Sequence, residues 1–366
     1  MSNIIKRKIE EEGKTYELNG KIIEVPGGYK ILENKGVFNP IYDRNGIIID
    51  YEQLSYQPVI ISAILKNYDS DTEKIELKFL ETGKTIIGEK SELYSNKIIK
   101  FANLGLEVNS NNAKIWIDLL SKLASFNRNV LPVKTTINRL GWIDDNTFIP
   151  YSISEFVLDV NESTESWINA LQVKGNLTIW VNQMNKLRGN YIFRFILATS
   201  FSAVLLKPTE TRSFVTYLWS KSRGGKTATG YCAMSVWGKA ENLKVSFDAT
   251  RVGIEGLSKI FSDLPILIDE KMIEDDKSKI SEIVYMFANG KAKLRGTQSG
   301  GVQKNSKWRA LAISTGEEPL SNNKSQDGVR TRVLELYGKP IDDEKIASEM
   351  YSFTRATLWF SWTSFY

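Results

Sequence analysis

The 366-residue sequence contains no histidine and only one cysteine, Cys232. The absence of histidine excludes Ser-His-Asp triads, histidine-based general acid–base catalysis and nearly all zinc sites. A single cysteine cannot form a disulfide within the chain, which indicates a reducing compartment. Whole classes of enzyme mechanism are therefore excluded by composition alone.

Long hydrophobic runs are also absent. The N-terminus, MSNIIKRKIEEEGKTYELNG, has no apolar core of signal-peptide length, and no segment keeps about 18 apolar residues in a row without a charge. We therefore expect a soluble, cytoplasmic protein with no membrane partner. The net charge of +5 at pH 7 is mildly basic, which permits nucleic-acid binding without requiring it.

Length and composition, with 42% hydrophobic and 25% charged residues, are those of an ordinary globular protein of two or three domains. Turn signals and changes of periodicity divide the chain into four expected regions. These are a mixed α+β N-terminal module over 1–150, a helical connector over 151–210, an α/β core over 211–340 and a C-terminal tail over 341–366.

Within the N-terminal module, β-type runs predict strands at Val59–Leu65 and Ile75–Phe79. Apolar residues at helical spacing predict helices at Ser91–Leu104 and Ala113–Phe126. The turn-rich segment 138–150 predicts a hairpin anchored by a tryptophan.

After residue 167 the pattern becomes helical. Tyr191–Leu206 is apolar on nearly all sides, which predicts a buried helix. From there to about residue 340 strands and helices alternate, a pattern typical of a parallel sheet with helices on both faces.

The most informative segment is SFVTYLWSKSRGGKTATG at Ser213–Gly230, an apolar β-type run followed by a Gly-Gly-Lys-Thr turn that opens a helix. Backbone N–H groups of such a turn and the positive end of the next helix bind phosphate. The segment approaches the nucleotide-binding pattern G-x-x-x-x-G-K-[ST], with a serine in place of the first glycine. The alternative is an ordinary helix N-terminus after a glycine turn.

On this pattern Lys226 would reach the β- and γ-phosphates of ATP, and the Thr227 hydroxyl would hold Mg²⁺. The remaining expected nucleotide contacts are Ser220, Ser222, Gly224, Gly225 and Ala228.

A second motif, LPILIDE at Leu264–Glu270, predicts a buried parallel strand that ends in two carboxylates. In P-loop hydrolases the first, here Asp269, holds the Mg²⁺ ion, and Glu270 would polarise the attacking water as general base. Alone this motif would be a strand ending in a turn; its position downstream of Lys226 favours the hydrolytic interpretation.

The segment Lys291–Arg309 contains six Lys or Arg residues, no acidic residue and a central Ser-Gly-Gly, which predicts a basic hairpin. We expect it to contact the phosphates of DNA, single-stranded or forked, rather than to be a solvated loop. The expected contacts are Lys291, Lys293, Arg295, Lys304 and Lys307.

The next strand, Arg309–Thr315, would place Ser314 or Thr315 near the γ-phosphate as a sensor, with plain strand termination as the alternative. In GVRTRVLEL, Arg330 and Arg332 precede a strand, a placement from which an arginine can reach the γ-phosphate of a neighbouring subunit. Surface ion pairing is the competing interpretation.

In order, the segments GWIDDNTFIP, WSKSRGGKTATG, SVWG, LPILIDE, YMFANGKAKLRG, WRALAISTGE and GVRTRVLEL resemble the domain of unknown function 927 family. This family consists of helicase-like AAA+ ATPases of phages, plasmids and staphylococcal-type mobile elements, similar to MCM-like helicases. The resemblance covers roughly residues 55–340.

The resemblance implies a P-loop AAA+ (RecA-like) fold, ATP and Mg²⁺ as cofactors, and a homo-hexamer that translocates on DNA during replication of a mobile genetic element, with other element-encoded proteins as partners. It assigns Lys226 and Thr227 to the phosphate loop, Asp269 and Glu270 to Mg²⁺ and catalysis, Thr315 to the sensor, and Arg332 to the basic residue before the last strand.

The sequence departs from the family at Ser220, where a glycine is usual, and at its end. The aromatic run ATLWFSWTSFY follows Arg355, and some reverse translations of this tail, shifted by one nucleotide, resemble the family's continuation. We therefore hypothesise a frameshift that truncates the C-terminal part. A short helix with packed aromatics is the alternative.

The sequence thus favours an ATP-dependent DNA helicase, with a nucleotide-dependent DNA-binding or regulatory module, or an inactive remnant, as the main alternative. A P-loop phosphotransferase acting on a small molecule is more remote, because the basic hairpin has no role in it.

Overall fold

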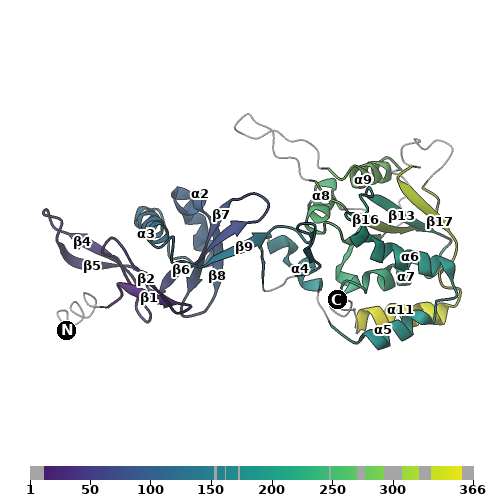
Figure 1. Cartoon of the computed structure of the whole chain (residues 1–366), viewed down its shortest axis with the longest axis horizontal. Helices are drawn as coiled ribbons and strands as arrows, with labels where there is room; N and C mark the ends of the chain where they lie inside the picture. The colour runs from purple at the N-terminus through teal and green to yellow at the C-terminus, as the bar shows by residue number, and fades with distance from the viewer. Residues whose placement is uncertain are drawn as a thin grey trace. The chain divides into compact units, whose positions relative to one another are not determined.

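The computed structural model describes residues 12–151, 155–160, 162–171, 174–246, 249–269, 277–291, 307–320 and 331–356. The chain forms two compact units, which Figure 1 shows in purple to blue and in teal to yellow. Unit 1 comprises residues 1–137 and 155–157, and unit 2 comprises 138–154 and 158–366. The division thus falls before residue 150, the boundary expected from the sequence.

Unit 1 is built on a five-stranded sheet with the order β12-β9-β6-β7-β8. Strand β6 is antiparallel to β7 and parallel to β9, and its β-branched, apolar sequence suits a strand buried on both faces. The strands predicted at Val59–Leu65 and Ile75–Phe79 are confirmed. The sheet consists of β6 (Val59–Asn67), β7 (Glu73–Phe79), β8 (Thr85–Glu89), β9 (Val133–Ile137) and β12 (Val157–Leu158).

Two smaller antiparallel sheets precede it in the chain. They pair β1 (Thr15–Leu18) with β2 (Lys21–Glu24), and β3 (Lys30–Leu32) with β4 (Gly36–Tyr42) and β5 (Ile48–Ser55).

The helix predicted at 113–126 is confirmed as α3 (Ala113–Phe126), whose residues Trp116, Leu119, Leu120 and Leu123 bury one face at helical spacing. The single helix predicted at 91–104 is wrong, because α2 (Lys90–Leu93) and the 3₁₀ helix η1 (Asn96–Leu104) are separate. Ser95 between them is extended, with φ −142° and ψ 173°, and its hydroxyl accepts a hydrogen bond from the Lys97 amide, so it begins a new helix.

Unit 2 contains a parallel five-stranded sheet with the order β14-β15-β16-β13-β17. The fold is therefore mixed α/β with a parallel sheet, as the alternation of strands and helices predicted. The strands are β13 (Phe214–Trp219), β14 (Lys244–Ser246), β15 (Pro265–Asp269), β16 (Leu311–Gly316) and β17 (Val333–Tyr337).

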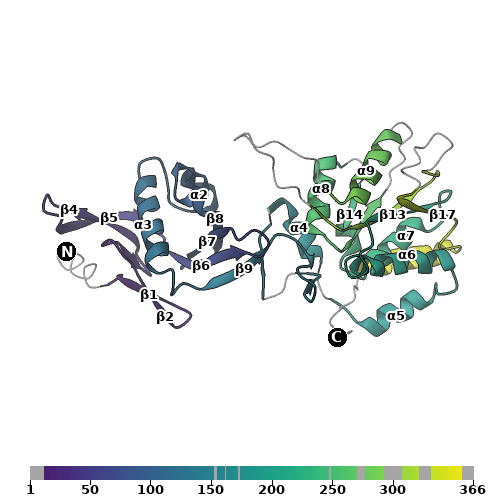
Figure 2. The same cartoon turned by 45° about the horizontal axis from the view of Figure 1, so that its top comes forward.

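Helices cover both faces of this sheet: Figures 1 and 2 show α8 and α9 on one side and α6 and α7 on the other. Within the described ranges, the helices of unit 2 are α4 (Glu162–Ala170), α5 (Leu177–Asn185), α6 (Tyr191–Ser202), η2 (Ala203–Leu205), α7 (Lys226–Met234), η3 (Ala240–Asn242), α8 (Arg251–Ile260), α9 (Lys277–Asn289) and α11 (Glu344–Ala356). No helix within the described ranges has the length and apolarity needed to cross a membrane.

The helix predicted at 191–206 is α6 followed by η2, but it is not buried all round. Ile192, Phe193 and Ile196 lie in the core, whereas Tyr191 is 67% and Phe195 41% exposed. Its apolar composition therefore overstated its burial, because α6 packs on α7 and the sheet along one side only.

The hairpin predicted at 138–150 is confirmed as β10 (Gly141–Trp142) paired with β11 (Phe148–Ile149). Its Trp142 donates a hydrogen bond from Nε1 to the Val204 carbonyl at 2.8 Å, and its backbone N–H donates to Asp263 Oδ2 at 3.1 Å. These contacts fix the hairpin to the rest of unit 2.

Candidate functional site

The order of the parallel strands predicts where unit 2 has a crevice. After β13 the chain crosses to β14 at one edge of the sheet, whereas after β16 it crosses β13 to reach β17 at the other edge. Connections that leave neighbouring strands in opposite directions open a crevice at the carboxyl ends of those strands, which is where ligands of open α/β sheets bind. The segment 220–225 follows β13 at this point.

The loop from Ser220 to Gly225 contains one glycine with a left-handed backbone, Gly225, and one that packs closely against a side chain, Gly224. Gly225, with φ 71°, precedes α7, and a Cβ there would lie 2.7 Å from Ile341 Cβ. A Cβ on Gly224 would lie 2.6 Å from the Ser220 hydroxyl. The Ser220 amide donates to the Gly316 carbonyl at 3.2 Å, so the loop is joined to the end of β16.

Lys226 begins α7, and its ammonium group lies over this loop. Nζ donates hydrogen bonds to the carbonyls of Ser220, at 2.6 Å, and Lys221, at 3.1 Å. The Thr227 residue follows in the first turn, where amide N–H groups have no partner within the helix. One turn further along α7, Gly230 packs closely against Leu267 of β15. A Cβ at this position would lie only 2.9 Å from the Leu267 side chain.

The sheet register brings Asp269 and Thr315 to the end of the same row. Asp269 pairs with Thr315, and Thr315 pairs with Leu218 of β13. Side chains alternate along a strand, so Asp269 lies on the same face of β15 as Leu267, the face that α7 covers. The structure therefore brings four features together at the carboxyl ends of the strands, here called the carboxyl edge of the sheet: the loop, the start of α7, Asp269 and Thr315. Glu270 lies outside the described residues.

The sequence did not indicate Lys244, which lies on the neighbouring strand β14. Its Nζ is 3.4 Å from Asp269 Oδ2 and 5.7 Å from the centre of the Tyr231 ring. Partial burial opposes ionisation, but the Tyr231 hydroxyl and the Asp269 carboxylate raise the pKa of Lys244. The short β-type run LKVS at 243–246 was the only local signal for this strand, and it does not indicate which carboxylate Lys244 contacts.

Glu317 was also missed. It follows β16 by one residue, and its carboxylate accepts a hydrogen bond from the Ser222 hydroxyl of the loop. A carboxylate two residues after the expected sensor threonine was the available signal.

The single cysteine, Cys232, is buried on α7, and burial raises the pKa of its thiol to about 12, so thiolate chemistry is excluded there.

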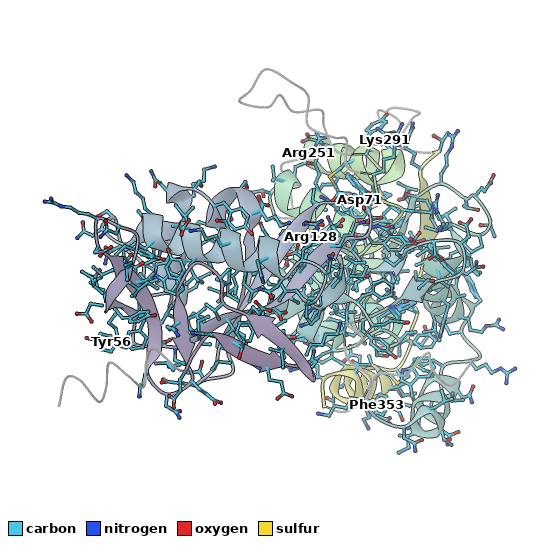
Figure 3. All side chains as sticks on the ribbon, turned by 60° about the vertical axis from the view of Figure 1, so that its left-hand side comes forward. Tyr56, Asp71, Arg128, Arg251, Lys291 and Phe353 are labelled. Atoms are coloured by element: carbon cyan, nitrogen blue, oxygen red, sulfur yellow. The ribbon has the colours of Figure 1, made fainter. Side chains whose placement is uncertain are left out.

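Three of the basic residues predicted to act on DNA or on a neighbouring subunit are described, and they lie at the amino ends of the strands: Lys291, Lys307 and Arg332. Arg332 precedes β17, whose first residue pairs with Val215 near the start of β13, and its guanidinium lies 5.1 Å from the centre of the Tyr285 ring. Lys291 and Lys307 form an isolated antiparallel bridge just before β16 (Figure 3 labels Lys291). Other predicted residues outside the described parts are Lys293, Arg295, Lys304 and Arg330.

The carboxyl edge has the groups needed to bind a nucleoside triphosphate with a divalent cation. A glycine-constrained turn before a helix N-terminus binds phosphate oxygens, and a hydroxyl and a carboxylate are ligands that Mg²⁺ accepts. Lys226, Thr227 and Asp269 are the described residues that could hold these groups. No group of three or more acidic or cysteine side chains in the described ranges forms a separate metal cluster.

Fold and site together define a mixed α/β protein whose parallel sheet carries a candidate ligand crevice at its carboxyl edge. A family model described as "Domain of unknown function (DUF927)" matches residues 31–308, and the chain belongs to that family.

Among solved structures, one described as "SCCmec type IV Cch - active helicase" is similar with a TM-score of 0.63 and 19% identity. The match covers 91% of this chain and 62% of that chain, so this chain spans less than two thirds of its relative. At this identity the likeness establishes a shared fold.

A second structure, "The A form apo structure of NrS-1 C terminal region-CTR", has a TM-score of 0.36 and 11% identity, over 81% of this chain and 64% of that one. No curated protein matches the sequence.

Proposed function

We propose that this protein is a P-loop ATPase of the AAA+ class that uses Mg²⁺-dependent ATP hydrolysis to move along DNA. The protein would act in the replication of a mobile genetic element, as a ring of six identical subunits. The proposal draws on the DUF927 membership, on the shared fold with a protein described as an active helicase, and on the carboxyl edge of the sheet in unit 2.

The observation that carries the proposal is the row Leu218–Thr315–Asp269 beside the loop that precedes α7. This register would place a magnesium ligand, a hydroxyl that senses the γ-phosphate and the phosphate-binding turn around one triphosphate. Mg²⁺, when bound, would neutralise charge on the phosphates and polarise them for attack.

The chain's own residues would each have one task in this scheme. Lys226 would release its two loop carbonyls and donate to the phosphate oxygens, while the amides of the first turn of α7 bind the β-phosphate. Asp269 would exchange its contact with Lys244 for the cation. Glu270 would accept the proton of the attacking water, and Arg332 would act on the nucleotide of a neighbouring subunit.

The experiment is an ATPase measurement on the purified chain, with and without single-stranded DNA, for the wild type and for Lys226→Ala. We expect DNA-stimulated hydrolysis in the wild type and a loss of about 100-fold or more in the variant, because the lysine supplies charge to the transferring phosphoryl group. Lys345→Ala, which removes an exposed lysine of α11, is the matched control.

Equal hydrolysis by wild type and Lys226→Ala would rule out the phosphate-loop assignment. Hydrolysis that DNA leaves unchanged, with no DNA binding, would remove the helicase part. Nucleotide-dependent DNA binding without hydrolysis would favour the regulatory module instead.

A further inference from the structure

A basic cavity lies at the amino ends of the parallel strands, here called the amino edge of the sheet, away from the loop at 220–225. Its volume is about 960 Å³, which lies at the large end of the range for ligand pockets. Ser213, Asp263, Arg309 and Arg332 each directly precede a strand or lie within two residues of its start. The strands are parallel, so this cavity and the turn at 220–225 occupy opposite edges of one sheet.

The charge of the wall is strongly one-sided. Seven of the residues that line the cavity are Lys or Arg, and two, Glu210 and Asp263, are acidic. Three of the cations were not indicated by the sequence: Arg139, Lys207 and Arg212. A wall of this charge raises the local concentration of anions.

Several cations are held in place by the backbone. Arg139 donates to the carbonyls of Trp142, at 2.5 Å, and Ile143, at 3.2 Å. Lys207 donates to the Asp144 carbonyl. Its ammonium also lies 3.2 Å from the exposed carboxylate of Asp145 and 5.9 Å from the centre of the Trp142 ring. Carbonyl contacts fix where these charges lie, and an exposed ion pair such as Lys207–Asp145 contributes little stability, so a ligand phosphate can compete for the cation.

Within the described part of the chain, two buried polar atoms of the wall lack a hydrogen-bond partner. Trp308 is 5% exposed and its Nε1 donor has no acceptor, and Asp263 Oδ1 accepts no hydrogen bond, with Arg309 Nη1 at 3.8 Å. Asp263 also has φ 60°, a left-handed conformation that is uncommon outside glycine and concentrates at functional sites. An orphaned donor beside several cations points to a ligand that carries acceptor oxygens.

The negative C-terminal ends of helices attract cations, but this attraction does not account for all of the charge in the cavity. Lys207 and Lys291 each follow a helix end by two residues, where a cation is favourable next to the helix dipole. Arg139 and Arg212 follow no helix end in the described residues before them, yet they line the same cavity.

We infer that this cavity binds the phosphate backbone of single-stranded nucleic acid. The cavity lies at the base of the predicted basic hairpin, because the bridge between Lys291 and Lys307 forms part of its wall. Trp142 and Phe214 also line it and are only partly buried, so they can contact bases that a single strand exposes and a duplex does not. This inference rests on the proposed function and adds a second binding region with its own residues.

The test measures the affinity of a fluorescent oligothymidine of about 20 nucleotides by anisotropy, without ATP, over a range of salt concentrations. The variants are Arg212→Ala and Lys207→Met, the second of which keeps an apolar stem over Trp142. We expect each to weaken binding by about three- to tenfold and to reduce the salt slope by about 0.7 for each phosphate that is no longer neutralised. Duplex DNA of equal length should bind less tightly than the single strand.

Arg188→Ala, an exposed arginine of the same unit outside the cavity, is the control and should retain wild-type affinity. The inference is overturned if the cavity variants bind like this control, or if they keep DNA affinity but lose ATP hydrolysis in the absence of DNA. The latter result would assign the cations to the triphosphate held by a second copy of the chain. The binding assay contains no nucleotide, so a failure of the ATPase proposal is recognised separately, from Lys226→Ala.

Discussion

The two edges of the parallel sheet in unit 2, which we propose as phosphate-binding sites, present two different surfaces. At the carboxyl edge the chain uses main-chain geometry: glycines at 224 and 225 and the N-terminus of α7. At the amino edge it uses side chains, with seven Lys or Arg residues around one cavity. The helix dipole contributes to the difference, because helices begin after the carboxyl ends of strands and end before the amino ends. Backbone at the amino edge is therefore partly negative, and cations must supply the attraction.

The largest effect is expected from Arg332, which would link the amino edge of one subunit to the carboxyl edge of the next. Arg332→Ala should reduce ATP hydrolysis by about 100- to 1000-fold, as for arginines that stabilise phosphoryl transfer. Mixing it with an equal amount of Lys226→Ala chain should restore activity at about a quarter of the interfaces, because those combine an intact loop with an intact arginine.

The measurement is the ATPase rate of each variant and of the mixture at the same total concentration. If the mixture is no more active than the variants alone, Arg332 acts within its own chain, through its contact with Tyr285, and the two edges do not cooperate.

The next effect concerns Asp269. Asp269→Asn should lower Mg²⁺-dependent ATP hydrolysis by about 100-fold, because an amide is a weaker magnesium ligand than a carboxylate. Oligonucleotide affinity at the amino edge should stay at the wild-type value. The control is Asp342→Asn, an exposed acid near α11, and a parallel loss of hydrolysis in that variant would contradict a specific role for Asp269.

A smaller effect is expected from Gly225→Ala. The left-handed φ of 71° and the 2.7 Å approach to Ile341 should cost about 1–2 kcal/mol of folding stability and weaken nucleotide binding. Thermal unfolding and nucleotide titration measure both. Gly256→Ala is the matched control: its Cβ would meet no atom within 4 Å, and alanine inside α8 should stabilise the protein by about 0.5–1 kcal/mol. Equal behaviour of the two variants would show that the loop does not need glycine.

The smallest effect is the pH dependence of Asp263 at the amino edge. Burial raises the pKa of the Asp263 carboxyl, although the Trp142 amide and nearby cations oppose the shift. A raised folded-state pKa means that the folded protein binds the proton more tightly, so this residue's contribution to stability is greatest at low pH and is lost as pH rises through the folded-state pKa. Asp263→Asn removes this dependence.

The difference in melting temperature, wild type minus Asp263→Asn, should therefore increase as pH falls from about 7 toward about 4, the range that spans the unfolded and raised pKa of an aspartate. A difference that stays constant over this range would show that Asp263 ionises normally. Nucleotide binding at the carboxyl edge should be the same in both proteins.

Local patterns predicted much of this structure. The strand at Pro265–Asp269, the helix at Ala113–Phe126 and the hairpin around Trp142 follow from short-range alternation, spacing and turn chemistry. The break at Ser95 was missed because apolar spacing continued across it, and the exposure of Tyr191 because composition does not report which side of a helix meets the sheet.

The sequence by itself determined the composition, the glycine-lysine-threonine turn, the strand that ends at Asp269 and the membership suggested by the order of motifs. Only the tertiary structure decided that Thr315 lies between Leu218 and Asp269, that Lys244 meets Asp269, and that the cations form a cavity at the other edge. The physical reason is that strand order and register join residues far apart in the chain, and no local periodicity specifies which strands become neighbours.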